Sequence, residues 1–398
     1  MKKLSLLLLL VSSCFGLRAN DGAFYAEGSH LIPITDTDIS VKKEILTVTR
    51  ITGPDFLSSR FQVNVYYEFF NPGDAKDIVV GFEAPPSDDY SEDDSNPSIH
   101  DFKVVMNGAD LPYQVAYVMY KYKGNKEFSS SMSVEDYYWD GKVHGITMHQ
   151  YDSITTAVFS DEEDELWHDW MGDLYYYVYH FNAHFNKGLN IIEHTYVFDG
   201  SGYVEAEYMF NYILTAANRW ANNGIDDFTL IINMGDRESF MVSPDFFSDS
   251  NEWTINGRGK VGITNSAAEC YIWYQAEKCP IFHISEGTIS FHKKNFHPEG
   301  NLRVAKPNNM CRQGDIKAQY FAINKDFRQN VYRKDMNPAE KRILKNLPFA
   351  YRGYVFKDEG LRTFFEMTDW YVPNPDYKAD VNQFSNDEKE WVEFFSHG

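Results

Sequence analysis

The chain has 398 residues, of which 43% are hydrophobic and 16% aromatic. It is long enough for two or three domains and too apolar to be disordered. Its 58 acidic side chains outnumber 37 lysines and arginines, giving a net charge of −21. So acidic a surface repels phosphate backbones and anionic lipid, so we expect no nucleic-acid partner.

The first twenty residues, MKKLSLLLLLVSSCFGLRAN, have the pattern of a secretory signal. Two lysines precede an apolar run from Leu4 to Val11 that is too short for a mature membrane anchor, and small residues follow. Cleavage after Ala19 leaves a soluble periplasmic protein. Alternatively, VSSC resembles a lipobox, which would make Cys14 the lipidated N-terminus of an outer-membrane lipoprotein. We favour removal of residues 1–19 as a signal peptide, and expect no transmembrane segment in the mature chain.

Residues 20–306 are expected to form a β-rich secreted domain, with two sub-domains as an alternative. In FQVNVYYEFF, every second residue from Phe61 to Phe69 is apolar, which is typical of a strand with one buried face. Asn107-Gly108 suits the type I′ turn of a hairpin. Two strands are expected around residues 186–188, and a helix at 160–170. The expected fold is mainly β, a two-sheet sandwich-like region followed by a small helical module.

After about Met310 the pattern becomes helical. N-cap signals occur in three places, supplied by Asn337 with Pro338 and Glu340, by Asp358, and by Ser385 with Glu388. Gly353 is a natural helix stop. We therefore expect a linker at 307–333 and a helical module at 334–398.

The module resembles the YARHG domain, a small bacterial extracellular module of unknown molecular function. Residues 344–356, LKNLPFAYRGYVF, follow the family run Leu-Arg-Asn-x-Ile-Tyr-Ala-Arg-His-Gly-Tyr-x-Phe. The positions identified as the structural motif are Asn346, Ala350, Gly353, Tyr354, Phe356 and Pro373. The chain departs from the family at Tyr351 and Arg352, which replace the Arg-His pair, and at Pro348, which removes a backbone donor. The preceding region is similar to a second secreted family of unassigned function, through stretches such as YILTAANRW.

Four residues of the module are candidate binding residues: Tyr351, Arg352, Trp370 and Tyr371. They remain after Phe356, Leu361 and neighbouring phenylalanines are assigned to the module core. Flat amphipathic rings beside a planar cation recur where proteins bind sugars, peptides or carboxylates. The alternative is that these side chains only cover the core.

Cysteine and histidine chemistry is expected to be limited. Cys270 and Cys279 would form a disulfide if they flank a hairpin with opposed side chains, and otherwise are two reduced, buried cysteines. Half of the twelve histidines cluster in one part of the chain, at His144, His149, His168, His180, His184 and His194. Two of them, His180 and His184, lie about 13 Å apart along a strand, too far for one zinc ion. We expect no metal site.

Two further motifs have plainer interpretations. GRGKVG at 257–262 fits GxGxxG, but no helix pattern follows to present its N-terminus to phosphate, so we expect hairpin or loop glycines and no cofactor. SDDYSEDDSNP at 87–97 lacks the spacing of an EF-hand, so a solvated acidic loop is favoured over a calcium site.

Two functions are consistent with this pattern. The first is a non-catalytic secreted cell-envelope protein that binds a glycan, peptide or protein. The second is an envelope hydrolase, a glycosidase or peptidase, whose site is assembled from residues distant in sequence. The absence of a nucleophile elbow or a metal-binding motif favours the first.

Overall fold

The computed structural model of the chain describes residues 27–28, 32–33, 38–52, 59–84, 94–95, 98–119, 146–147, 175–203, 206–263, 279–307, 323 and 337–396. Several sequence-based expectations lie outside these residues: the signal peptide with Cys14, the helix at 160–170, most of the acidic loop, and Cys270.

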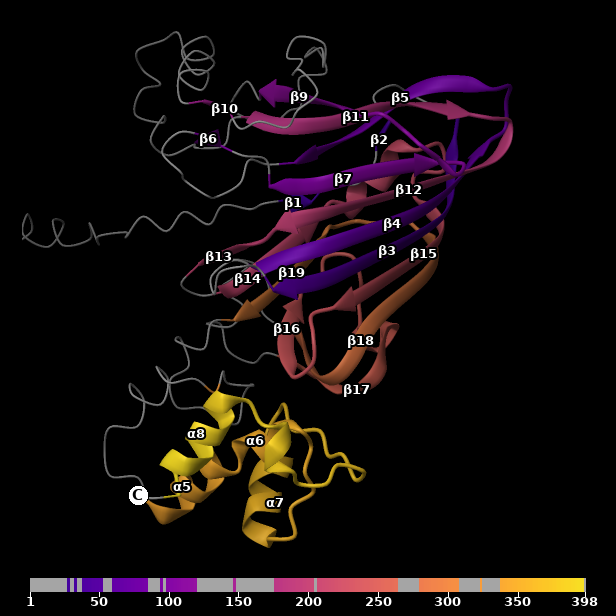
Figure 1. Cartoon of the computed structure of the whole chain (residues 1–398). Coiled ribbons are helices and arrows are strands. Elements are labelled where there is room, and N and C mark those ends of the chain that lie inside the picture. The colour runs from indigo at the N-terminus through magenta and orange to yellow at the C-terminus, as the bar shows by residue number, and fades with distance from the viewer. Residues whose placement is uncertain are drawn as a thin grey trace, which may run out of the picture.

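The described part of the chain is mainly β and is dominated by one large, curled sheet (Figure 1). Its strands, in spatial order, are β1 (Glu27–Gly28), β14 (Ala206–Tyr212), β19 (Leu302–Pro307), β16 (Glu238–Val242), β18 (Pro280–Phe296), β15 (Ile225–Asn233), β3 (Ser40–Thr52), β4 (Ser59–Asn71), β12 (Gly188–Asp199), β7 (Ile99–Met106) and β8 (Ala109–Asp110). In addition, β13 (Ser201–Tyr203) pairs with β14, and β17 (Trp253–Ile263) pairs with β18.

A smaller sheet packs against the large one. It consists of β2 (Ile32–Pro33), β5 (Lys76–Ala84), β11 (Tyr175–Phe185) and β9 (Gln114–Met119), and β6 (Asp94–Ser95) pairs separately with β10 (Ile146–Thr147). Phe82 of β5 stacks on Tyr179 of β11 at 5.1 Å and meets Phe102 of β7 at 5.0 Å. The two sheets therefore share one core, as expected for a sandwich-like fold.

The large sheet also folds back on itself. Phe61 of β4 contacts Phe210 of β14 at 5.0 Å between ring centroids, although the two strands are distant within the sheet. The side chains that bring the halves together come from the alternation recognised in the sequence: Phe61, Val63, Val65, Tyr67 and Phe69 are all buried. A period of two thus places one apolar face of β4 in the core, as predicted.

Local turn signals were also confirmed. Asn107 and Gly108 both have positive φ, 50° and 83°, and join β7 to β8 with Met106 opposite Ala109. The chain then continues into β9 of the other sheet. The segments on either side of residues 186–188 are strands, β11 and β12, but they belong to different sheets.

The module contains α5 (Pro338–Lys345), α6 (Leu347–Tyr351), α7 (Glu359–Glu366), α8 (Asn386–Phe394) and a 3-10 turn, η7 (Val381–Gln383). Two other 3-10 turns, η3 (Leu214–Arg219) and η4 (Ser250–Glu252), lie in the β region. The three predicted N-caps are present, with full capping boxes at Asn337 and Ser385. Pro348 marks a break, because the helix ends before Asn346 and restarts as α6 with the proline in its first turn.

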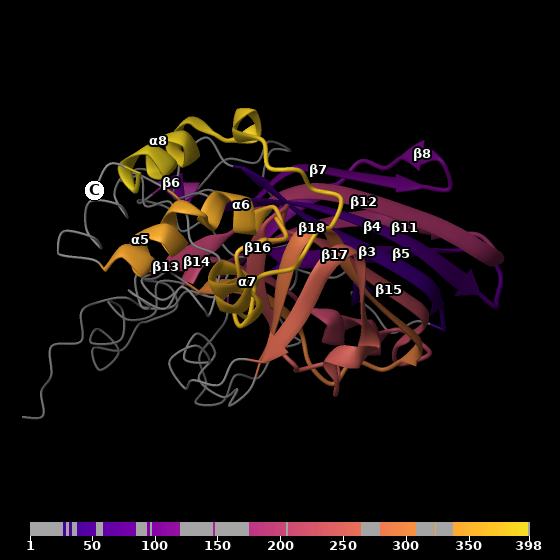
Figure 2. The same ribbon diagram turned by 90° about the horizontal axis from the view of Figure 1, so that it is seen from below.

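The module has its own core and lies at one end of the sheet, below β16, β17 and β18 (Figure 1). Viewed from below, the helices lie in front of this end of the sheet (Figure 2). Ile323 also packs against the module core, which brings part of the expected linker to the module. None of the helices among the described residues has the length and apolar composition that crossing a bilayer requires.

Candidate binding site at the junction of the two domains

Arg352 lies at the end of α6, the second of the two consecutive helices that begin the module. It follows α6 directly, and Gly353 after it has a φ of 76°. A Cβ at Gly353 would lie 2.5 Å from the main-chain oxygen of Val372, so only glycine fits. The chain therefore turns sharply and leaves the guanidinium beside the start of α8.

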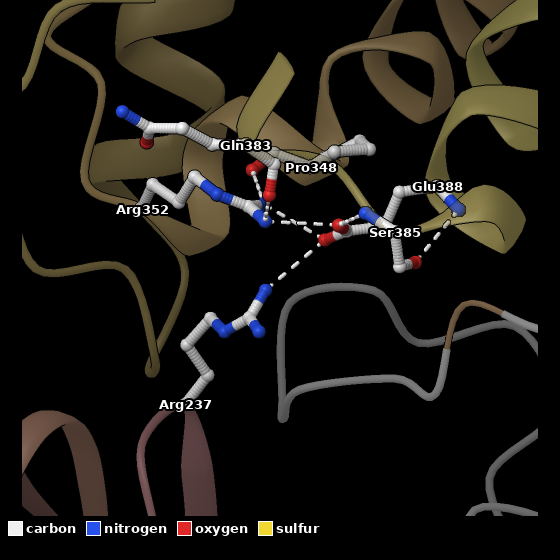
Figure 3. A network of polar contacts seen from close by, with 6 residues as sticks. All are labelled: Arg237, Pro348, Arg352, Gln383, Ser385 and Glu388. Atoms are coloured by element: carbon white, nitrogen blue, oxygen red, sulfur yellow. Dashed lines mark hydrogen bonds and ion pairs between the residues drawn. The ribbon is translucent and has the colours of Figure 1, made fainter. Parts of the chain in front are cut away.

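The Arg352 guanidinium forms a two-pronged ion pair with Glu388 (Figure 3). Nη1 and Nη2 donate to the two carboxylate oxygens at 2.7 and 2.9 Å, and they also donate to the main-chain oxygens of Pro348 and Gln383. The guanidinium lies 4.7 Å from the ring centre of Phe384. Both charged side chains are largely buried, at 13% and 7% exposed, so the geometry is fixed on all sides.

Glu388 has two functions in the module. It is the N3 residue of the capping box that Ser385 begins, and its carboxylate accepts from the Ser385 amide at 2.8 Å. Burial alone would raise the pKa of Glu388, but the hydrogen bonds from Arg352 and Ser385 and the charges of Arg352 and Arg237 outweigh it. The pKa of this carboxyl is therefore lower than usual, and the group is ionised at neutral pH.

A second arginine reaches Glu388 from the β domain. Arg237 lies just before β16, at a φ of 59°, which is uncommon for a non-glycine residue. Its Nη1 donates to the Glu388 carboxylate at 3.0 Å, and its side chain is 41% exposed. The carboxylate is thus shared by one arginine from each domain (Figure 3).

Lys260 of β17 makes the second contact between the domains. Its ammonium donates to the main-chain oxygen of Thr368 at 2.7 Å, just after α7 ends. A cation is favourable at a helix C-terminus because the last carbonyl groups carry partial negative charge. Burial lowers the pKa of Lys260, and the nearby Asp369 opposes this effect.

The four candidate binding residues of the module do not lie on one surface. Tyr351, Trp370 and Tyr371 are in the module core, and Trp370 is fully buried. Tyr371 donates its hydroxyl to the main-chain oxygen of Tyr354, and burial raises its pKa to about 12. In this conformation only Arg352 lies at the junction, so a ligand contact through all four residues stays a prediction.

The residues identified as the YARHG structural motif have local structural roles. Asn346 donates to the main-chain oxygen of Arg342, and Gly353 accepts from the Asn374 amide, next to Pro373. Ala350 and Phe356 are buried, and Tyr354 packs against the same core.

A serine–histidine pair lies near the junction. The Ser239 hydroxyl and His283 Nδ1 are 2.8 Å apart, and His283 Nε2 has no hydrogen-bond partner among the described residues. Both residues are buried, and burial, with the charge of Lys260, lowers the pKa of His283 to about 3. A base this weak, in a buried pair, is poorly suited to activate a nucleophile.

The segment GRGKVG, residues 257–262, is part of strand β17. Its glycines lie opposite β18, where the register shifts between Arg258 and Gly259. A Cβ at Gly257 would lie 2.2 Å from the Glu286 oxygen, and one at Gly259 2.7 Å from the His283 oxygen. These glycines permit close approach of two strands at a bulge, which accounts for the motif without a nucleotide.

No group of three potential metal-ligating side chains occurs among the described residues. His180 and His184 lie four residues apart in β11, and His184 pairs with Asp77 on the surface. Cys279 is fully buried, and since Cys270 lies outside the described residues, their disulfide stays a prediction.

A second candidate surface is the outward face of β3, β4 and β12, which we call the outer sheet face. It consists of the half-buried or exposed residues that alternate with the core: Ile45, Thr47, Thr49, Gln62, Asn64, Tyr66, Glu193, Thr195 and Val197. The register aligns them in three rows, Ile45–Tyr66–Glu193, Thr47–Asn64–Thr195 and Thr49–Gln62–Val197. The middle row carries only hydroxyl and amide groups.

Arg237, Lys260 and the outer sheet face were not recognised in the sequence. An arginine in a turn and a lysine in a strand have no local signal, and Glu388 was identified only as a capping residue. The outer face could have been found, because Thr47, Asn64 and Thr195 each alternate with buried neighbours in their own strand.

Comparison with known families identifies the module. Residues 320–396 match the YARHG domain, beginning before the expected start at residue 334. YARHG domains occur in secreted or extracellular proteins. The C-terminal resemblance seen in the sequence is therefore confirmed.

No curated protein matches the chain. Among solved structures, a Legionella pneumophila protein provisionally described as nutrient-binding is 16% identical, with a TM-score of 0.45. The match covers 93% of this chain and 97% of that one.

Proposed function

We propose that this chain is a non-catalytic, secreted protein of the bacterial cell envelope that binds a glycan through the outer sheet face. After removal of residues 1–19 it would be periplasmic, with lipidation at Cys14 and outer-membrane attachment as the alternative. The observation that carries the proposal is the middle row of this face, Thr47–Asn64–Thr195, flanked by the Tyr66 ring.

The chemistry of the face suits a neutral sugar chain. Hydroxyl and amide side chains both donate and accept hydrogen bonds, as sugar hydroxyls require. Tyr66 adds a flat ring with a polar end, and its hydroxyl donates to Glu68 at 3.1 Å, which holds the ring in one orientation. The three side chains of the middle row are uncharged, and the row ends beside Lys103 of β7, which lies opposite Thr195.

Two other places in the molecule are less suitable for a glycan than the outer sheet face: the junction and the interior of the sandwich. At the junction, the Arg352–Glu388 pair is already satisfied within the module. Inside the sandwich, the Tyr67 and Tyr212 hydroxyls lie 3.2 Å apart, and Tyr212 approaches Glu44 at 3.5 Å, but all three side chains are fully buried. The alternative of an envelope hydrolase gains no support from the Ser239–His283 pair.

The test is retention of the mature protein on an array of envelope glycans. Asn64→Ala and Tyr66→Ala should each reduce retention about tenfold, because each removes a hydrogen bond or a stacking surface worth roughly 1–1.5 kcal/mol. The matched control is Asn182→Ala, an exposed asparagine on the smaller sheet, which should bind normally.

Equal retention of the two asparagine variants would overturn the assignment of the outer sheet face. Binding to envelope proteins but to no glycan would overturn the ligand class.

A further inference from the structure

Two basic side chains of the β domain form a pair beside β18. Arg237 precedes β16, and its amide donates to the Ser285 oxygen. Lys260 of β17 lies opposite His283 on the other edge of β18. The two residues are thus separated by about two strand spacings, roughly 10 Å. We call these two cationic side chains the basic site; Asp236 and Glu238 flank Arg237 in the sequence.

The module supplies the groups that this basic site binds. Glu388 offers a carboxylate to Arg237, and the segment after α7 offers the Thr368 main-chain oxygen to Lys260. Burial lowers the pKa of Lys260, and Asp369 lies close enough to oppose part of this effect. The occupant is therefore a protein segment with a carboxylate and an accessible carbonyl group.

The contact between the two domains is replaceable. The apolar side chains of the β domain and of the module form separate cores, so no shared apolar cluster of described residues joins them. In the Arg237–Glu388 pair the arginine is 41% exposed and the glutamate 7% exposed, so solvent and salt reach the pair from the arginine side and weaken it. Polar contacts of this type allow domains to separate.

We propose that Arg237 and Lys260 form a docking site for an acidic segment of a partner protein, and that the module of the same chain occupies this site as an internal competitor. A partner that offers a carboxylate to Arg237 and a carbonyl group to Lys260 reproduces both contacts and displaces the module. This site is separate from the outer sheet face and does not depend on glycan binding.

The test uses Glu388→Gln in the full mature chain. Glutamine is accepted at this position of a capping box, so α8 keeps its cap while the charge that holds Arg237 is removed. The probe is fluorescent poly-L-glutamate, and binding is measured by anisotropy at about 0.15 M salt, where the repulsion between the probe and the acidic chain is largely screened. We expect Glu388→Gln to bind roughly two- to fivefold tighter than the unmodified chain, the range that one partly exposed ion pair supplies.

Controls separate this effect from a general change of charge. Asp387→Asn removes a charge from the same helical turn and should leave binding unchanged. Arg237→Asn should weaken binding both alone and combined with Glu388→Gln, and asparagine tolerates the positive φ of this position. Comparing Arg237→Asn with the unmodified chain tests the proposal even if Glu388→Gln folds poorly.

The proposal would be overturned if Arg237→Asn left poly-L-glutamate binding unchanged in the unmodified chain and also in Glu388→Gln. An equal gain in Asp387→Asn would also overturn it, since the effect would then come from net charge.

Discussion

Trp391 donates a hydrogen bond from its indole Nε1 to the main-chain oxygen of Leu344 at 2.7 Å, and this bond joins the last helix of the module to its first. Both residues are buried. The Leu344 oxygen lies near the end of α5, where the Asn346 amide at the C-cap also donates to it. Trp391 therefore closes the module as well as filling its core.

Trp391→Phe should destabilise the module by about 2–3 kcal/mol. The substitution leaves the Leu344 oxygen buried without this partner and reduces the packed volume. Urea unfolding followed by far-ultraviolet circular dichroism measures the loss. Phe394→Leu, in the same helix but 47% exposed, is the control and should change stability by less than about 0.5 kcal/mol.

Gly353→Ala should destabilise the module by about 2 kcal/mol or more. The φ of 76° disfavours any side chain, and the new Cβ would lie 2.5 Å from the Val372 oxygen and 2.8 Å from Asn374. The melting temperature of the module should fall accordingly. Gly360→Ala is the matched control, because Gly360 lies in α7 and its nearest atom would be 3.4 Å away. An increase of up to about 1 kcal/mol is expected there. Equal loss in both variants would show that the turn at Gly353 is not strained.

Much of the fold could be predicted from local patterns. The alternation along β4, the Asn107-Gly108 turn and the caps at Asn337 and Ser385 are local properties of the chain, and each was found where the sequence placed it. Strand pairing is not local. The separation of β11 and β12 into different sheets depends on contacts with partners far along the chain, which a short turn at residues 186–188 does not specify.

The junction could be predicted only in part. Arg352 was predicted as a candidate binding residue, but its partner Glu388 is 36 residues away and Arg237 comes from another domain. Trp370 and Tyr371 were candidate binding residues because they remained after Phe356, Leu361 and neighbouring phenylalanines were assigned to the module core. They are buried instead because a module this small needs its large rings in the core.

Brief trypsin digestion should separate the β domain from the module. Residues 307–333 were predicted as a linker, but the YARHG match begins at 320 and Ile323 packs on the module core. The cuts should therefore fall at Arg312 or Lys317, both before the match. Mass spectrometry of the two stable pieces identifies the sites, and replacing both residues with glutamine should prevent the cleavage. Simultaneous loss of both pieces would contradict a two-domain organisation.

The stability of the module should depend on pH through Glu388. The folded pKa of this carboxyl is lower than its unfolded value, near 4.5, so its ionised form stabilises the folded state. This contribution is complete above about pH 5 and is lost as the pH falls through the folded pKa.

The groups that face Glu388 are Arg352, Arg237, Ser385 and, further away, Tyr377. The two arginines stay charged and Tyr377 stays protonated in acid, so the carboxyl itself is the group that titrates.

The measurement is the free energy of unfolding of the module between pH 7 and pH 3, from urea titrations. The unmodified chain should lose stability below about pH 4.5, and Glu388→Gln should lose less, because it has no charge at this position to titrate. Some loss should persist in the variant, since the pKa of Asp358 at the start of α7 is also lowered by its hydrogen bonds to the Leu361 amide and Arg342. Identical pH profiles for the two proteins would show that the shared carboxylate does not stabilise the module.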